Sequence, residues 1–140
     1  MLFLLAACAR EAPPPVSALE FRAQCFADDS GAIAAEVQGI PAWFGPPRRF
    51  AIAGLYAATD AQGHPAIRVE IAPESRASFE AFTTAGVSGP VGLFVDGALI
   101  AVPSIQPIAD GRFTFCNEAG GWSAADRDAW LARMRAAEGG

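Results

Sequence analysis

The residues that could do chemistry in this chain are few and scattered. His64 is the only histidine, and it lies in a Gly-His-Pro segment four residues after Asp60. A catalytic histidine needs a carboxylate to orient it and a nucleophile to activate, and only the carboxylate is close in the sequence. The pair is therefore typical of a turn held by hydrogen bonds, and we expect no catalytic residue, no metal site and no cofactor.

Two groups of acidic residues allow other interpretations. Residues 28–31 (Asp-Asp-Ser-Gly) begin like a calcium-binding loop. They lack the later acidic ligands of an EF-hand, so a solvated turn is expected. Glu70, Glu74 and Glu80 could act as acid and base only if their surroundings separated their pKa values. Nothing in the sequence does so, which predicts an ordinary charged face. Because nucleotide-binding and hydrolase motifs are also missing, the sequence favours a non-enzyme with no small-molecule substrate.

Cys8 is the residue with the clearest chemical prediction. It follows Leu-Ala-Ala after an apolar stretch, and small residues before a cleavage point are what a signal peptidase requires. This tetrapeptide resembles the lipobox of bacterial lipoproteins, which implies removal of residues 1–7 and attachment of a diacylglycerol to Cys8. Only four residues precede the box, so we expect the true start codon to lie upstream. The alternative is an ordinary cysteine in a frayed apolar end.

Cys25 and Cys116 remain once Cys8 carries lipid, and an even number suits an oxidising compartment. A disulfide between them would close a loop of about 90 residues and stabilise the fold by about 4 to 5 kcal/mol in the chain-entropy model. The alternative is two buried thiols that behave as small apolar side chains. We expect no zinc or redox role, because the chain has no Cys-x-x-Cys motif and one histidine.

The composition fits one folded domain without a membrane-spanning helix. Of the 140 residues, 52% are apolar and 18% are charged, which excludes disorder over the whole length. The longest apolar run, residues 1–9, is about half the length that a membrane-spanning helix needs. Ten arginines, no lysine and fifteen acidic residues give a net charge of −5, which argues against a nucleic-acid partner.

The elements that must position these residues follow from the hydropathy pattern. Residues 8–17 carry three consecutive prolines after Cys8 and predict an extended tether, followed by one domain at 18–140. Alternating or continuous apolar runs predict strands at 19–26, 50–58, 65–72, 91–95, 98–102 and 112–116, and helical periodicity predicts helices at 73–85 and 123–137. We therefore predict an α+β fold, with a single antiparallel or mixed sheet of about five to six strands and two helices on one face.

Residues 32–38 are ambiguous, and residues 39–47 are rich in proline and glycine, which predicts a loop. Trp43 and Phe44 lie within that predicted loop. Exposed aromatic side chains are enriched at the centres of protein interfaces, so this pair is a candidate interaction site. The alternative is a loop that folds back to cover the core.

A series of motifs follows in a fixed order from residue 65. The first motifs are a strand, a helix with aromatic residues and an apolar strand. Asp-Gly comes next, and because it lies between two apolar runs it predicts a hairpin. A second strand and a set of turn-forming and core residues come next. The residues that carry the pattern are Asp96, Gly97, Pro103, Ile105, Ile108 and Gly111. This order resembles the head subdomain of the first periplasmic domain of SecD/SecF-type protein-export membrane proteins.

The resemblance covers about half of the chain and implies a periplasmic α+β domain in contact with polypeptide. The spacing from Ile105 to Ile108 is one residue shorter than in the family. The family's transmembrane helices are missing from this chain, so proton-driven translocation does not carry over. We expect a lipoprotein that is anchored to a membrane through its lipid, faces the periplasm and binds an envelope protein or peptide without catalysis. A small secreted hydrolase or enzyme inhibitor, and a purely structural envelope component, remain alternatives.

Overall fold

The computed structural model describes residues 19–37, 39–84, 90–103, 108, 110–116 and 121–139. Its elements, in chain order, are β1 (Leu19–Cys25), β2 (Ile33–Val37), β3 (Ile40–Phe44), β4 (Ile52–Thr59), β5 (Pro65–Ile71), α2 (Pro73–Thr84), β6 (Val91–Val95), β7 (Ala98–Ala101), β8 (Arg112–Phe115) and α3 (Ala124–Gly139). Within these residues, every helix is too short or too polar to cross a membrane.

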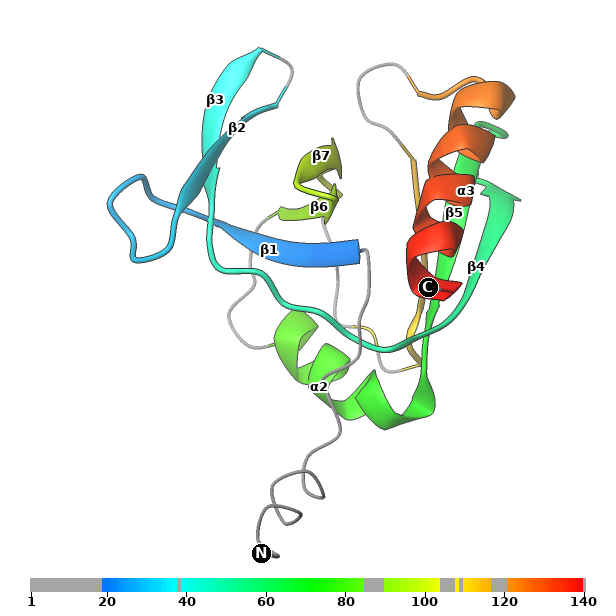
Figure 1. Cartoon of the computed structure of the whole chain (residues 1–140), viewed down its shortest axis with the longest axis horizontal. Helices are drawn as coiled ribbons and strands as arrows, with labels where there is room; N and C mark the ends of the chain where they lie inside the picture. The colour runs from blue at the N-terminus through cyan, green and yellow to red at the C-terminus, as the bar shows by residue number, and fades with distance from the viewer. Residues whose placement is uncertain are drawn as a thin grey trace, which may run out of the picture.

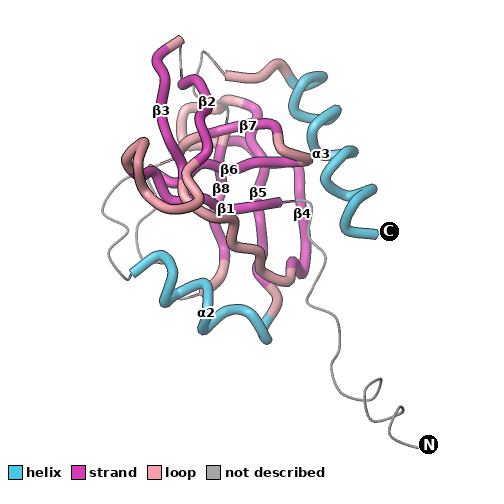
Figure 2. Tube along the Cα trace, turned by 60° about the vertical axis from the view of Figure 1, so that its left-hand side comes forward, coloured by secondary structure: helices cyan, strands magenta, loops and turns pink. Residues whose placement is uncertain are grey.

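The strands form two antiparallel sheets instead of the single sheet expected. One has the order β2-β3-β1-β6-β7 and the other the order β4-β5-β8. The predicted α+β class is confirmed. The β4–β5 hairpin pairs with β8 and not with β1 or β6, although apolar side chains of both sheets share one core cluster. Figure 2 shows the strands gathered between α2 and α3.

The core lies between the two sheets and is rich in phenylalanine. Phe21 of β1 is fully buried. Its ring meets those of Phe50, Phe79, Phe82 and Phe113 edge-on, with centroids 5.4 to 6.3 Å apart. Edge-to-face contacts of this kind add to the free energy gained by burying apolar surface. One side chain of β1 thus links α2 to β8, the last strand of the second sheet.

The hairpin and helix signals of the sequence are confirmed. Asp96 and Gly97 join β6 to β7 with φ of 52° and 81°, the positive values that a two-residue hairpin turn of this type requires. Ser123 caps α3, since its Oγ accepts the Asp126 N–H at 3.0 Å. Met134 is fully buried on the inner face of that helix. These elements form where the sequence predicts them because their signals are local.

The predicted loop at 39–47 is wrong, because residues 40–44 form β3. This strand pairs with β2 along its length and with β1 through Trp43 and Phe44. Phe44 is fully buried, and its ring meets that of Phe94 edge-on at 5.5 Å. Trp43 is half-buried. Phe44 therefore belongs to a second apolar cluster and is not part of an exposed interaction loop.

Gly92 makes room for that second cluster. A Cβ at Gly92 would lie 2.8 Å from the Phe94 ring and 2.9 Å from the Phe44 ring, closer than carbon atoms pack. We expect Gly92→Ala to lower the free energy of unfolding by about 1 to 3 kcal/mol, because both rings must shift. Urea denaturation measures this loss. Gly45→Ala is the control, since its Cβ would meet only the Ala23 carbonyl oxygen at 3.6 Å. Equal losses in the two variants would contradict the steric explanation.

Candidate functional site

The β4–β5 turn contains the histidine that the sequence singled out. Asp60 Oδ1 accepts the backbone N–H groups of Gln62 and His64 at 2.9 and 2.8 Å, and Asp60 Oδ2 lies 3.2 Å from His64 Nδ1. The bond from the His64 N–H is the main reason that the pKa of Asp60 lies below its ordinary value. The Cys116 thiol donates to the same Oδ2 at 3.7 Å. The pair holds the turn, as the sequence predicts.

The predicted disulfide between Cys25 and Cys116 is not formed. In the part of the chain that the structure describes, both residues are thiols. Cys25 ends β1 in the five-stranded sheet, whereas Cys116 follows β8 in the three-stranded sheet. Each thiol faces a carboxylate near its own sheet, Asp29 for Cys25 and Asp60 for Cys116. Burial, and then the negative charge of Asp29, raises the pKa of the Cys25 thiol.

The acidic residues considered as ligands or catalysts occupy separate places. Glu70 lies on β5 between Arg68 and Arg112, with its Oε2 at 3.5 and 4.0 Å from their Nε atoms. Glu74 and Glu80 are exposed on α2. Asp29 Oδ2 accepts the Phe26 N–H at 2.8 Å and holds the turn after β1. Among the described residues, no group of three His, Cys, Asp or Glu side chains could hold a metal ion.

The motif residues shape the backbone. The Pro103 carbonyl accepts the first N–H of β6 at 3.1 Å, and the Gly111 carbonyl accepts the last N–H of β5 at 2.7 Å. Gly111 has a φ of 73°, a conformation that favours glycine. The Ile108 N–H donates to Thr83 Oγ1 at 3.1 Å. Cys8 and Ile105 lie outside the described residues, as does the tether.

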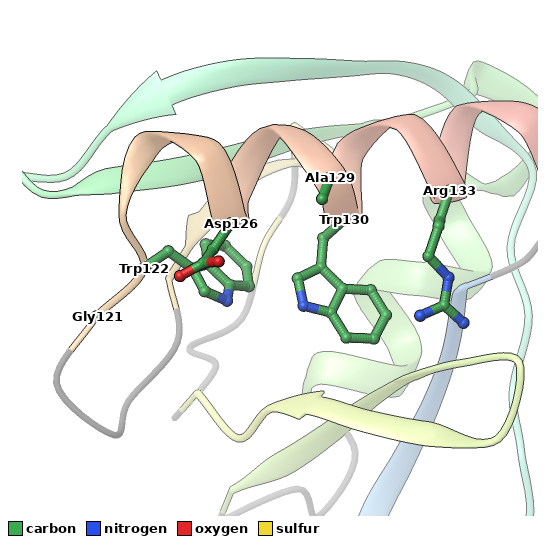
Figure 3. Close-up of a pocket in the computed structure, with 6 residues that line it drawn as sticks. All are labelled: Gly121, Trp122, Asp126, Ala129, Trp130 and Arg133. Carbon is green, nitrogen blue, oxygen red and sulfur yellow. The ribbon is translucent and has the colours of Figure 1, made fainter.

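A cleft of about 510 Å³ lies beside α3 (Figure 3). The residues that line it come from the start and one side of that helix: Gly121, Trp122, Asp126, Ala129, Trp130 and Arg133. Asp126 and Trp130 are spaced by four residues, which places them in one row along α3, and Trp122 lies two residues before the helix begins. Figure 3 shows Trp122 on the segment that leads into α3, and the Trp130 side chain extending from the helix toward the β6–β7 hairpin.

The two ends of this cleft differ in character. At one end, the Trp122 indole is buried and packs edge-on against Phe115 at 5.8 Å. At the other end, the Arg133 guanidinium lies 4.4 Å from the centre of the Trp130 ring, and its Nη2 is 3.3 Å from Asp96 Oδ2 in the β6–β7 turn. The cleft therefore offers fixed aromatic surface with a carboxylate between the indoles and a cation at one end. The four-residue spacing of the tryptophans and aspartate is the signal that could have indicated it.

The second distinctive surface is the β2–β3 arm, defined here as residues 26–37 and 39–44. Figure 1 shows this hairpin projecting away from the rest of the molecule. Four large apolar side chains are exposed in the described residues, and three of them lie on the arm: Phe26 at 76%, Ile40 at 67% and Ile33 at 37%. The arm therefore carries most of the large apolar side chains that are exposed in the described residues.

Comparison with known proteins bears on the fold. No family model and no curated protein matches the sequence. A crystal structure of SecDF in a super-membrane-facing form aligns with a TM-score of 0.60 and 19% identity, over 84% of this chain and 19% of that one. A structure of SecDF, described as a membrane component that enhances protein export, aligns with a TM-score of 0.61 and 18% identity, over 90% of this chain and 64% of that one.

The chain has a SecDF-like fold. The resemblance to SecD/SecF-type proteins indicated by the order of motifs is thereby confirmed at the level of fold. The alignment also extends beyond the half of the chain that carries those motifs. The chain spans 19% and 64% of the lengths of the two SecDF chains.

Proposed function

We propose that this chain is a lipid-anchored domain of the bacterial cell envelope that binds polypeptide near a membrane, without catalysis, in support of protein export. The SecDF-like fold supports the link to export, since SecDF enhances protein export. The Leu-Ala-Ala-Cys tetrapeptide supports the anchor. With ten residues between the lipid and β1, the domain would stay within about 35 Å of the membrane surface even with the tether fully extended.

The observation that carries polypeptide binding is the cleft beside α3. Tryptophan and arginine are the residue types most enriched among the side chains that dominate binding energy at protein interfaces. The Trp130 indole stacks under Arg133, so both are ordered before a partner arrives, which reduces the entropy lost on binding. A polypeptide offers apolar side chains to the indoles, backbone N–H groups to Asp126 and carbonyl groups to Arg133. It can therefore use the aromatic, acidic and cationic groups that line the cleft.

The test measures binding of a permanently unfolded protein to the full chain with Cys8→Ser, so that no lipid is attached. A reduced and alkylated model protein carries a fluorescent label, and its anisotropy is followed as the chain is added. We expect saturable binding in the micromolar range. Trp130→Ala and Arg133→Glu should each weaken it by about tenfold to thirtyfold, since truncating such a side chain costs about 1.4 to 2 kcal/mol.

Arg112→Glu is the matched control, because it makes the same charge reversal on an exposed side chain of β8. We expect this variant to bind like the parent chain, and circular dichroism verifies that every variant is folded. Absence of saturable binding by the parent chain would refute polypeptide binding. Equal weakening by Arg112→Glu and Arg133→Glu would show that net charge, not the cleft, determines binding.

A further inference from the structure

We propose that the outer edge of β2 binds an extended, basic segment of a partner polypeptide, which adds to the five-stranded sheet as a sixth strand. This inference rests on the proposed function and deepens it, because it names a second site and the chemistry of the segment recognised. It depends on the backbone of β2, the apolar side chains of the arm and the charge of the arm.

The backbone of β2 is available on one side. β2 is the outermost strand of its sheet and pairs with β3 from Ile33↔Phe44 to Val37↔Ile40. Among the described residues, no strand pairs with its other side. The outward N–H and C=O groups of such a strand are a template for an additional strand. Strand addition of this kind is an established mode of peptide recognition, with affinity supplied by main-chain hydrogen bonds.

The edge of β2 lacks most of the features that block an edge strand against any partner. Edge strands are commonly protected by proline, by charged side chains, above all lysine, or by a bulge. β2 reads Ile-Ala-Ala-Glu-Val, with no proline or cation, and its register with β3 is continuous. Its one charged side chain, Glu36, repels an acidic segment and attracts a basic one. Neighbouring β3 pairs with β1 only at Trp43 and Phe44. Its other half carries Pro41, which has no N–H to offer. The β3 side of the arm is therefore less able to pair with a further strand, whereas the outer side of β2 is able to.

Three exposed apolar side chains lie on the arm that carries this open edge. Ile33 begins β2, and Ile40 lies in β3 opposite Val37 at the far end of the same hairpin. Phe26 belongs to the turn between β1 and β2. A strand laid along β2 would contact side chains on both faces of the sheet, and alternate apolar residues in it would cover Ile33 and its neighbours. The apolar groups therefore favour an extended partner over a small polar ligand.

The charge of the arm selects the partner. Asp28, Asp29 and Glu36 lie on the arm, and residues 23–44 contain no arginine or lysine, so all ten arginines are elsewhere. A second copy of this chain would place two acidic arms edge to edge, and like charges in that position repel. An anionic membrane surface would be repelled as well. A segment in which apolar residues alternate with lysine or arginine complements both the edge and its charge.

The test uses a labelled peptide of about nine alternating valine and lysine residues, blocked at both ends, which is long enough for one strand. Its binding to the full chain with Cys8→Ser is followed by fluorescence anisotropy. Two comparison peptides replace lysine by glutamate or carry N-methyl groups on alternate backbone nitrogens. We expect the valine–lysine peptide to bind at least about tenfold more tightly than either, and to lose affinity as salt is added.

Variants of β2 locate the binding site. Ile33→Lys places a lysine on the open edge, and Glu36→Lys reverses a charge on the same strand. Each substitution should weaken the binding of the valine–lysine peptide at least about tenfold. Glu74→Lys makes the same charge reversal on the exposed first turn of α2 and should leave binding unchanged. Equal binding of the N-methylated peptide, or equal effects of Glu36→Lys and Glu74→Lys, would overturn the proposal.

Other occupants of the edge would be recognised directly. We expect sedimentation equilibrium to show no self-association that Ile33→Lys removes, and we expect vesicles of anionic phospholipid not to bind through the arm. Self-association of that kind would make a second copy of the chain the partner, and vesicle binding through the arm would make a membrane the partner. The unfolded model protein separates this proposal from the previous one. If that protein binds through Trp130 and Arg133 while the β2 variants alter no binding, the edge proposal fails and the proposed function stands. If neither probe binds, both fail.

Discussion

Phe21→Ala is expected to lower the free energy of unfolding by about 3 to 5 kcal/mol. The Phe21 ring is fully buried and contacts four other phenylalanine rings that come from α2, β8 and the segment before β4. Its removal leaves a cavity where the two sheets and α2 meet, and the surrounding rings can collapse only in part. Small domains are stable by about 5 to 15 kcal/mol, so this variant should unfold at a much lower urea concentration.

Phe26→Ala is the matched control for that experiment. Phe26 lies five residues further along the chain, and 76% of its surface is exposed. Its replacement should change the free energy of unfolding by no more than about 0.5 kcal/mol. Urea titrations of the three proteins, followed by circular dichroism, measure both effects. Similar losses for the two variants would show that the core does not depend on the Phe21 ring.

Cys8→Ser is expected to abolish both lipid attachment and recovery of the protein in the membrane fraction. A thioether to diacylglycerol needs the cysteine sulfur, which serine does not have. Two acyl chains hold a protein stably at a membrane, whereas one gives only marginal binding. Metabolic labelling of cells with an alkyne fatty acid, followed by fractionation, measures label and location together. The Cys25→Ser control should keep both the lipid label and the membrane location. A Cys8→Ser protein that is still labelled and still found in the membrane fraction would contradict lipid attachment at Cys8.

The parts of the fold that could be predicted from sequence are those with local signals. Asp-Gly between two apolar runs gives the β6–β7 hairpin, and Ser123 with its following turn gives the start of α3. The sequence pattern does not predict β3, because three prolines and two glycines within residues 39–47 are typical of loops. Phe44 packs against Phe94, which lies fifty residues later in the chain. A local sequence pattern cannot predict a contact between residues so far apart.

The candidate sites depend on long-range contacts and were therefore harder to predict. The cleft lies on the side of α3 that faces the β6–β7 hairpin, where Arg133 reaches Asp96 across 37 positions of sequence, while the helix itself packs on β4 and β5. The disulfide prediction failed for a related reason, since the number of cysteines reports on the compartment and not on position. Cys25 ends a strand of one sheet and Cys116 follows a strand of the other, and the pattern of strands in the sequence does not show the division into two sheets.

The most direct test of polypeptide binding near the membrane is photocrosslinking in living cells during protein export. A photoreactive amino acid is placed at position 26 on the arm, at 130 in the cleft, or at Tyr56, which is exposed on β4. A secretory polypeptide is held partway through export and the cells are irradiated. We expect adducts between this protein and that polypeptide from positions 26 and 130 and none from 56. No adduct from either 26 or 130, with the protein present in the membrane fraction, would contradict the proposed function.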